Sequence, residues 1–157
     1  MGTTRRDALK TGGGATLLAV LAGAGWLAPR GAQAQAWNKA AFETHAMDET
    51  MKALGGAPPA QSKDIAFVAT PDIAENGAVV PIGIASSIPK TESIAILIEK
   101  NPNMMAALFD IPAGTEPAIT TRVKMGQTSN VYALVKADGK YYVASKEIKV
   151  TLGGCGG

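Results

Sequence analysis

The chain has 157 residues, a formal net charge of +2, one cysteine and one histidine. A single cysteine excludes an internal disulfide, and one cysteine with one histidine is too small a ligand set for a zinc site. Residues 1–34 hold four basic residues and one acidic residue, so the rest of the chain carries a formal charge of −1. Without a surplus of positive charge, binding to nucleic acid phosphates is not expected.

Residues 1–34 have the pattern of an export signal. Arg5 and Arg6 precede a mildly apolar stretch rich in Gly, Ala and Leu, and an Ala-Gln-Ala run ends at Ala34. Small residues in that spacing are what a signal peptidase recognises, and the arginine pair indicates the twin-arginine route. We therefore predict a cleaved signal peptide and a periplasmic protein, with cleavage after Ala34 or, as second choice, Ala36. An uncleaved membrane anchor is the alternative.

Residues 37–54 have the spacing of one amphipathic helix. Apolar side chains recur at helical intervals as far as Leu54, and Asn38 is suited to cap the first turn. Gly55 opens a short run of glycines and prolines, which cannot continue a helix. We expect one helix followed by a Gly/Pro linker within residues 35–60.

Residues 61–152 hold seven short β-type runs separated by turn residues. The expected strands are 65–69, 79–84, 94–98, 105–111, 119–125, 131–136 and 140–152. Pro81 indicates an edge strand or a bulge, because proline has no amide to donate to a ladder. The Ala-Asp-Gly run before Lys140 predicts a hairpin. Together these runs predict a mainly β fold, an immunoglobulin-like antiparallel β-sandwich preceded by one α-helix, with a small barrel as the rival architecture.

The sequence closes on five residues predicted to form a flexible arm: Gly153, Gly154, Cys155, Gly156 and Gly157. Glycine adds little bulk and leaves the backbone free, and five extended residues span about 17 Å. The last predicted strand leads directly into these glycines, so a rigid body would carry one thiol on a thin arm. An unpaired cysteine in an oxidising compartment is a liability unless it is buried or used. We interpret Cys155 as used.

Other chemistry finds little support in the sequence. His45 lies on the predicted helix and is interpreted as a surface or packing residue, because a Cys–His nucleophilic pair needs a contact that a mobile arm is poorly suited to hold. Haem-attachment, phosphate-loop and dinucleotide-binding motifs do not occur. We therefore predict no catalytic residue, no metal ligand and no cofactor. A disulfide-linked dimer through Cys155 is an alternative use of the thiol.

The run 141–152, followed by Gly-Gly-Cys-Gly-Gly, resembles the end of the SoxY family. That family supplies the sulfur-carrier subunit of the periplasmic Sox sulfur-oxidising system. The resemblance implies that Cys155 is the covalent attachment point for sulfur derived from thiosulfate, and that the carrier itself is not an enzyme. It implies a heterodimer with a SoxZ-like subunit. It also implies transient contacts with a haem enzyme (SoxAX) that conjugates thiosulfate, a hydrolase (SoxB) that releases sulfate, and in some organisms an oxidising SoxCD enzyme.

Two other classes of protein fit parts of this pattern. Ubiquitin-like sulfur carriers also end in Gly-Gly, but they use the terminal carboxylate and need neither an export signal nor a cysteine. A periplasmic binding or interaction module with an incidental or dimer-forming thiol is the second alternative. The predicted organisation is a signal peptide (1–34), a helix with linker (35–60), a β-sandwich (61–152) and a carrier arm (153–157).

Overall fold

The computed structural model describes residues 38–151. Within them, the helices are α2 (Lys39–Phe42) and α3 (Met47–Ala53), and the strands are β1 (Ala60–Gln61), β2 (Ile65–Val68), β3 (Ile73–Ala74), β4 (Val80–Ser86), β5 (Thr91–Ile98), β6 (Met105–Asp110), β7 (Ala118–Val123), β8 (Ser129–Ala137) and β9 (Lys140–Val150). The predicted signal peptide, with Arg5 and Arg6, and the predicted arm, with Cys155, lie outside the described residues.

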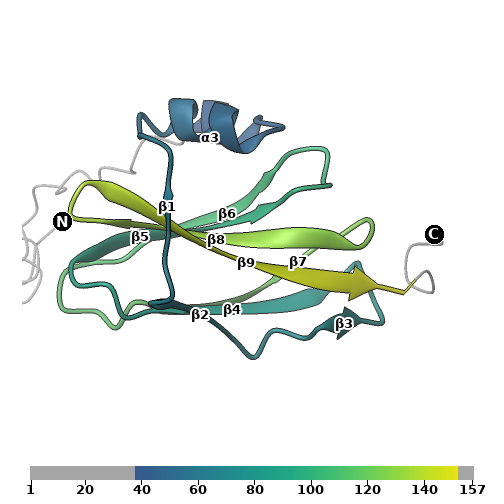
Figure 1. Ribbon diagram of the computed structural model, residues 1–157. Coiled ribbons are helices and arrows are strands. Elements are labelled where there is room, and N and C mark those ends of the chain that lie inside the picture. The colour runs from purple at the N-terminus through teal and green to yellow at the C-terminus, as the bar shows by residue number, and fades with distance from the viewer. Residues whose placement is uncertain (1–37, 152–157) are drawn as a thin grey trace, which may run out of the picture. The chain divides into compact units, whose positions relative to one another are not determined.

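The strands form two sheets that pack face to face (Figure 1). The larger sheet has the order β1-β9-β8-β5-β6, with β3 also paired to β9, and the smaller sheet has the order β2-β4-β7. The long strands pair antiparallel, whereas the two-residue strands β1 and β3 pair parallel with β9. The predicted antiparallel, immunoglobulin-like β-sandwich is therefore confirmed.

Strand β5 shows how the core is divided. Ile94, Ile96 and Ile98 point into the core between the two sheets, and Ala95 and Leu97 point to the opposite face, which α2 and α3 cover. Successive side chains of a strand point to opposite faces of the sheet, so a strand covered on both faces is apolar at every position. This explains the continuous apolar run 94–98 that predicted a central strand.

The single helix predicted over residues 37–54 is wrong in its middle, where the structure has two short helices. The Thr44 carbonyl accepts a hydrogen bond from the Met104 amide at 2.7 Å, and the Thr44 hydroxyl donates to the Ala41 carbonyl at 2.8 Å. A continuing helix would need the Thr44 carbonyl for the amide four residues on. Asn38 caps α2 as predicted, since its Oδ1 accepts from the Ala41 amide at 3.2 Å.

The predicted end of the helical region at the two glycines is confirmed. Gly55 has φ 68°, in the left-handed region that favours glycine. Its amide donates to the Lys52 carbonyl at 3.0 Å, and the Gly56 amide donates to the Met51 carbonyl at 2.9 Å. These two bonds form a Schellman ending, which satisfies the last carbonyls of α3. Neither helix in residues 38–151 is long and apolar enough to cross a membrane.

Pro81 lies in β4, the central strand of the smaller sheet, so the predicted edge strand or bulge is wrong. The β2–β4 register runs from Ser86 to Gly83 and stops there, and Pro81 pairs with Arg122 of β7 without a register shift. Among the described strands, β4 therefore has a neighbour on one side only at Pro81. The missing proline amide costs no ladder bond on the open side.

The predicted hairpin between β8 and β9 is confirmed. Ala137 pairs with Lys140, and the two residues between them, Asp138 and Gly139, have φ 48° and 73°. Two central residues with positive φ are typical of a type I′ turn, whose twist matches that of the flanking strands. The turn sets the register of β9, the strand that leads toward Cys155.

Candidate functional site

The predicted attachment residue, Cys155, lies outside the described residues, four positions beyond Thr151. The glycines predicted to form the arm lie outside them too: Gly153, Gly154, Gly156 and Gly157. Their roles therefore stay predictions. The structure describes the segment from which they continue, residues 148–151, which we call the arm root.

On one side, the arm root is bonded to the short parallel strand β3. The Lys149 amide donates to the Asp72 carbonyl at 2.9 Å, and the Thr151 amide donates to the Ala74 carbonyl at 3.1 Å. The second bond involves the last described residue. The backbone is thus held in the sheet up to the point where residue 152 begins.

On the other side, the arm root meets the start of β8. Ile148 pairs with Ser129 and is fully buried in the core between the sheets. Two positions past the last ladder pair, the Val150 amide donates to the Thr128 hydroxyl oxygen at 3.0 Å. A side-chain acceptor therefore replaces the missing strand partner, and Thr128 is a positioning residue that the sequence did not reveal.

A lysine of β9 fastens the loop before β3 to the same strand. The Lys146 ammonium donates to the Thr70 carbonyl at 2.6 Å and forms an ion pair with Asp72 at 2.9 Å. Asp72 is also the residue whose carbonyl accepts from Lys149. The charge of Lys146 is thereby partnered within the body of the protein, and it strengthens the contact between β3 and the arm root.

His45 occupies a surface position, as predicted. Its Nδ1 donates to the Pro102 carbonyl, and its amide donates to a carboxylate oxygen of Glu49 at 2.9 Å. The ring therefore ties the link between α2 and α3 to the turn between β5 and β6. Within residues 38–151, no group of three or more His, Cys, Asp or Glu side chains could hold a metal ion.

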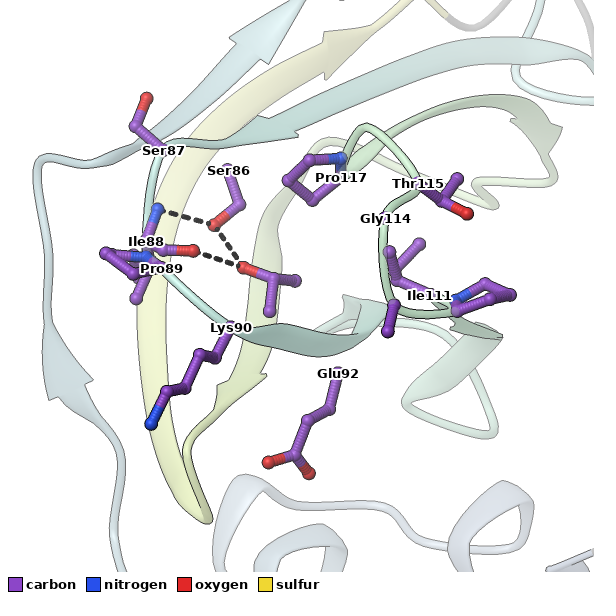
Figure 2. Close-up of a pocket in the computed structure, with 13 residues that line it drawn as sticks. Ser86, Ser87, Ile88, Pro89, Lys90, Glu92, Ile111, Gly114, Thr115 and Pro117 are labelled. Atoms are coloured by element: carbon purple, nitrogen blue, oxygen red, sulfur yellow. Dashed lines mark hydrogen bonds between the residues drawn. The ribbon is translucent and has the colours of Figure 1, made fainter.

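A cavity of about 650 Å³ lies between the β4–β5 and β6–β7 connections (Figure 2). Two of its hydroxyl groups are engaged: the Ser86 and Thr91 hydroxyl oxygens lie 3.0 Å apart, and Thr91 donates to the Ile88 carbonyl at 2.8 Å. Thr91 pairs with Ala137, next to the start of β9. The cavity is thus at the opposite end of the sandwich from the arm root, roughly 33 Å away along β9.

The charged residues near this cavity belong to ion pairs around the β8–β9 turn. Glu92 lies 2.9 Å from Lys136 and accepts from the Gly139 amide, and these contacts hold the pKa of Glu92 below its usual value. The same pair raises the pKa of Lys136. Lys90, 3.0 Å from Asp138, lowers the pKa of that carboxyl group. Among the described residues that line the cavity, the two ionisable side chains, Lys90 and Glu92, are thus both engaged in ion pairs.

The fold and the arm root define a class of protein: a small β-sandwich whose last strand is bonded on both edges and leads to a lone cysteine among glycines. A family model described as sulfur oxidation protein SoxY matches residues 50–155. The chain belongs to the SoxY family. The match covers the arm root and extends to Cys155.

Among solved structures, the chain is similar to the sulfur carrier protein SoxY from Chlorobium limicola f thiosulfatophilum, with 38% identity and a TM-score of 0.60, covering 67% of this chain and 94% of that one. It has a distant likeness to a structure of the bacterial superantigen toxic shock syndrome toxin-1, with 12% identity and a TM-score of 0.40, covering 55% of this chain and 98% of that one. A second distant likeness is to the human F-spondin reeler domain, with 8% identity and a TM-score of 0.41, covering 61% of this chain and 94% of that one. These two likenesses are too remote to bear on function. A search of the curated proteins found no match.

Proposed function

We propose that this protein is a covalent carrier of sulfur intermediates in thiosulfate oxidation, with Cys155 as the attachment point. The observation that carries the proposal is the SoxY family match, which runs through the arm root to residue 155. The relative from Chlorobium limicola, itself a sulfur carrier protein, is 38% identical and adds support. The carrier supplies a thiol and a position, and its partners supply the catalysis.

The proposed chemistry has two steps, conjugation of thiosulfate to the thiol and hydrolytic release of sulfate. In the first, the Cys155 thiol and thiosulfate form a sulfur–sulfur bond, giving Cys–S–S–SO₃⁻, one proton and two electrons, which a SoxAX-like haem enzyme accepts. In the second, a SoxB-like hydrolase adds water to the terminal sulfonate, releasing sulfate and two protons and leaving the persulfide Cys–S–S⁻. A SoxCD-like enzyme, where one exists, would oxidise the remaining sulfur.

The arm root suits this role because it separates a fixed body from a short tether. Cys155 lies four residues beyond Thr151, so its Cα can reach at most about 14 Å from the Thr151 Cα. A tether of that length keeps the bound intermediate at high effective concentration near any enzyme that holds the body. We propose a heterodimer with a SoxZ-like subunit, exported folded to the periplasm through the signal that contains Arg5 and Arg6.

Substitution of the cysteine tests the proposal. Cys155→Ser should abolish thiosulfate oxidation in cells that depend on this protein. It should leave the melting temperature unchanged, since we assign Cys155 to a glycine tether and not to the core. Thiosulfate oxidation that survives in Cys155→Ser would instead support an interaction module with an incidental thiol.

A further inference from the structure

Exposed large apolar side chains concentrate in one connection of the described structure. In residues 38–151 they are Val68, Ile73 and Val79, which are 41%, 56% and 50% exposed. Val68 is the last residue of β2, and Ile73 and Val79 lie between it and the start of β4. Single apolar side chains scattered over a surface need no explanation, whereas apolar side chains that form a contiguous exposed patch mark interaction sites.

Ile73 lies next to the arm root, and Val79 follows it six residues later in the chain. Ile73 belongs to β3 and pairs with Lys149, two residues before Thr151. Val79 ends the turn that follows β3, and its amide donates to the Asn76 carbonyl at 3.3 Å. In Figure 1, β3 lies beside the carboxyl end of β9.

The backbone holds these two side chains in place. Ala74 directly follows Ile73, and its carbonyl accepts a hydrogen bond from the Thr151 amide at 3.1 Å. The Gly77 carbonyl, two residues before Val79, accepts from the Met125 amide at 2.7 Å. The backbone beside Ile73 is therefore held by the end of β9, and the backbone before Val79 is held by Met125, two residues after β7.

We propose that Ile73 and Val79 form a docking rim for the haem enzyme that conjugates thiosulfate to Cys155, which meets the rim with apolar residues around the mouth of a recessed active site. This inference rests on the proposed function. Because Cys155 reaches at most about 14 Å from Thr151, an enzyme that takes the thiol into a recess must bring its surface against the body around the arm root. Lys146 and Asp72 are paired with each other nearby. Ile73 therefore offers an apolar contact beside the exposed charge of Lys149, its strand partner.

Val68, the last residue of β2, provides a matched control. It is also exposed, but it pairs with Gly83, four residues along β4 from Val79. At the usual rise of a strand, that places Val68 roughly 13 Å further from the end of β4 that faces the arm root. Loss of its apolar surface should not affect docking at the rim.

The test uses the full chain, with any subunit that copurifies, as the varied substrate of the thiosulfate-conjugating haem enzyme. The double variant Ile73→Thr with Val79→Thr should raise KM about tenfold with little change in kcat, because docking is lost and the chemistry is not. Val68→Thr should change KM less than about twofold. A small disulfide reagent should modify Cys155 at the same rate in all three proteins, because that reaction needs no docking.

Three results would overturn the docking rim. One is an unchanged KM in the double variant while Cys155 is still conjugated, a result that leaves the proposed function intact. The second is release of a copurifying subunit, or a change of mass in sedimentation, which would assign the two side chains to a stable interface. The third is an equal rise of KM in Val68→Thr.

Failure of the wild-type chain to accept thiosulfate would instead overturn the proposed function. If the double variant melts early, Ile73→Thr and Val79→Thr are measured singly.

Discussion

The Thr151 amide donates to the Ala74 carbonyl at 3.1 Å, so the last described residue before the predicted arm is bonded to β3. On the opposite edge, Val150 is bonded to the Thr128 hydroxyl. The origin of the proposed tether is thus fixed to the sandwich on both edges of β9. A carrier that presents one sulfur atom to several enzymes benefits from such a fixed origin, because each enzyme can then find the thiol by binding the body.

The hydroxyl of Thr128 should hold the arm root. Thr128→Val keeps the shape of the side chain and removes the acceptor for the Val150 amide. The free energy of unfolding should fall by about 1–2 kcal/mol, and hydrogen exchange at Val150 should accelerate. Urea unfolding and amide exchange measure the two effects. Thr120→Val, at an exposed position of β7, is the control, and an unchanged exchange rate at Val150 would contradict the assigned role.

A glycine in β4 should be intolerant of any side chain. A Cβ at Gly83 would overlap the Val68 carbonyl oxygen, which is backbone and cannot turn away. Gly83→Ala should therefore lower the free energy of unfolding by about 1–3 kcal/mol in urea. At Gly126, a Cβ would meet no described atom within 4 Å, so Gly126→Ala should be close to neutral. Equal effects at the two positions would mean that the β2–β4 contact is looser than described.

The helices should contribute to the stability of the sandwich. Met51 of α3 is 3% exposed and packs on the outer face of the larger sheet. Met51→Ala should cost about 2–4 kcal/mol, through lost burial and the cavity that remains. Its neighbour Lys52 is exposed, and Lys52→Ala should change the stability by less than about 0.5 kcal/mol. A neutral Met51→Ala would show that the helical region does not belong to the folding unit.

The ion pair of Glu92 should make stability depend on pH in the acidic range. The Lys136 contact lowers the pKa of Glu92 in the folded protein, so the pair stabilises the fold above the ordinary carboxyl value of 4.5. That stabilisation is lost as the pH falls from 4.5 through the lower folded value. The difference in urea midpoint between wild type and Glu92→Gln should therefore be present at pH 7 and shrink at pH 3. The same difference in urea midpoint at both pH values would contradict the stabilising role of the Glu92–Lys136 pair.

Elements whose residues follow a regular local pattern could be predicted from the sequence. The continuous run 94–98, the alternating positions of β9 and the Asp138-Gly139 turn all indicated their structures, because local chemistry decides them. The two-residue strands β1 and β3 were missed, since two residues are too few to show an alternation of apolar and polar side chains.

The remaining differences have tertiary causes. The predicted helix is interrupted because the Thr44 carbonyl binds Met104, sixty residues away in sequence. Pro81 fits a central strand because β2 stops short of it. Thr128 had no signal at all, since a single side-chain acceptor beside a strand end depends on how the chain folds.

The most direct test of the carrier role is intact-mass measurement with peptide mapping on protein purified from cells grown on thiosulfate. We expect adducts of thiosulfate-derived sulfur on the peptide that contains Cys155, removable by a thiol reductant. A preparation in which Cys155 is only a free thiol or a plain disulfide dimer would contradict it.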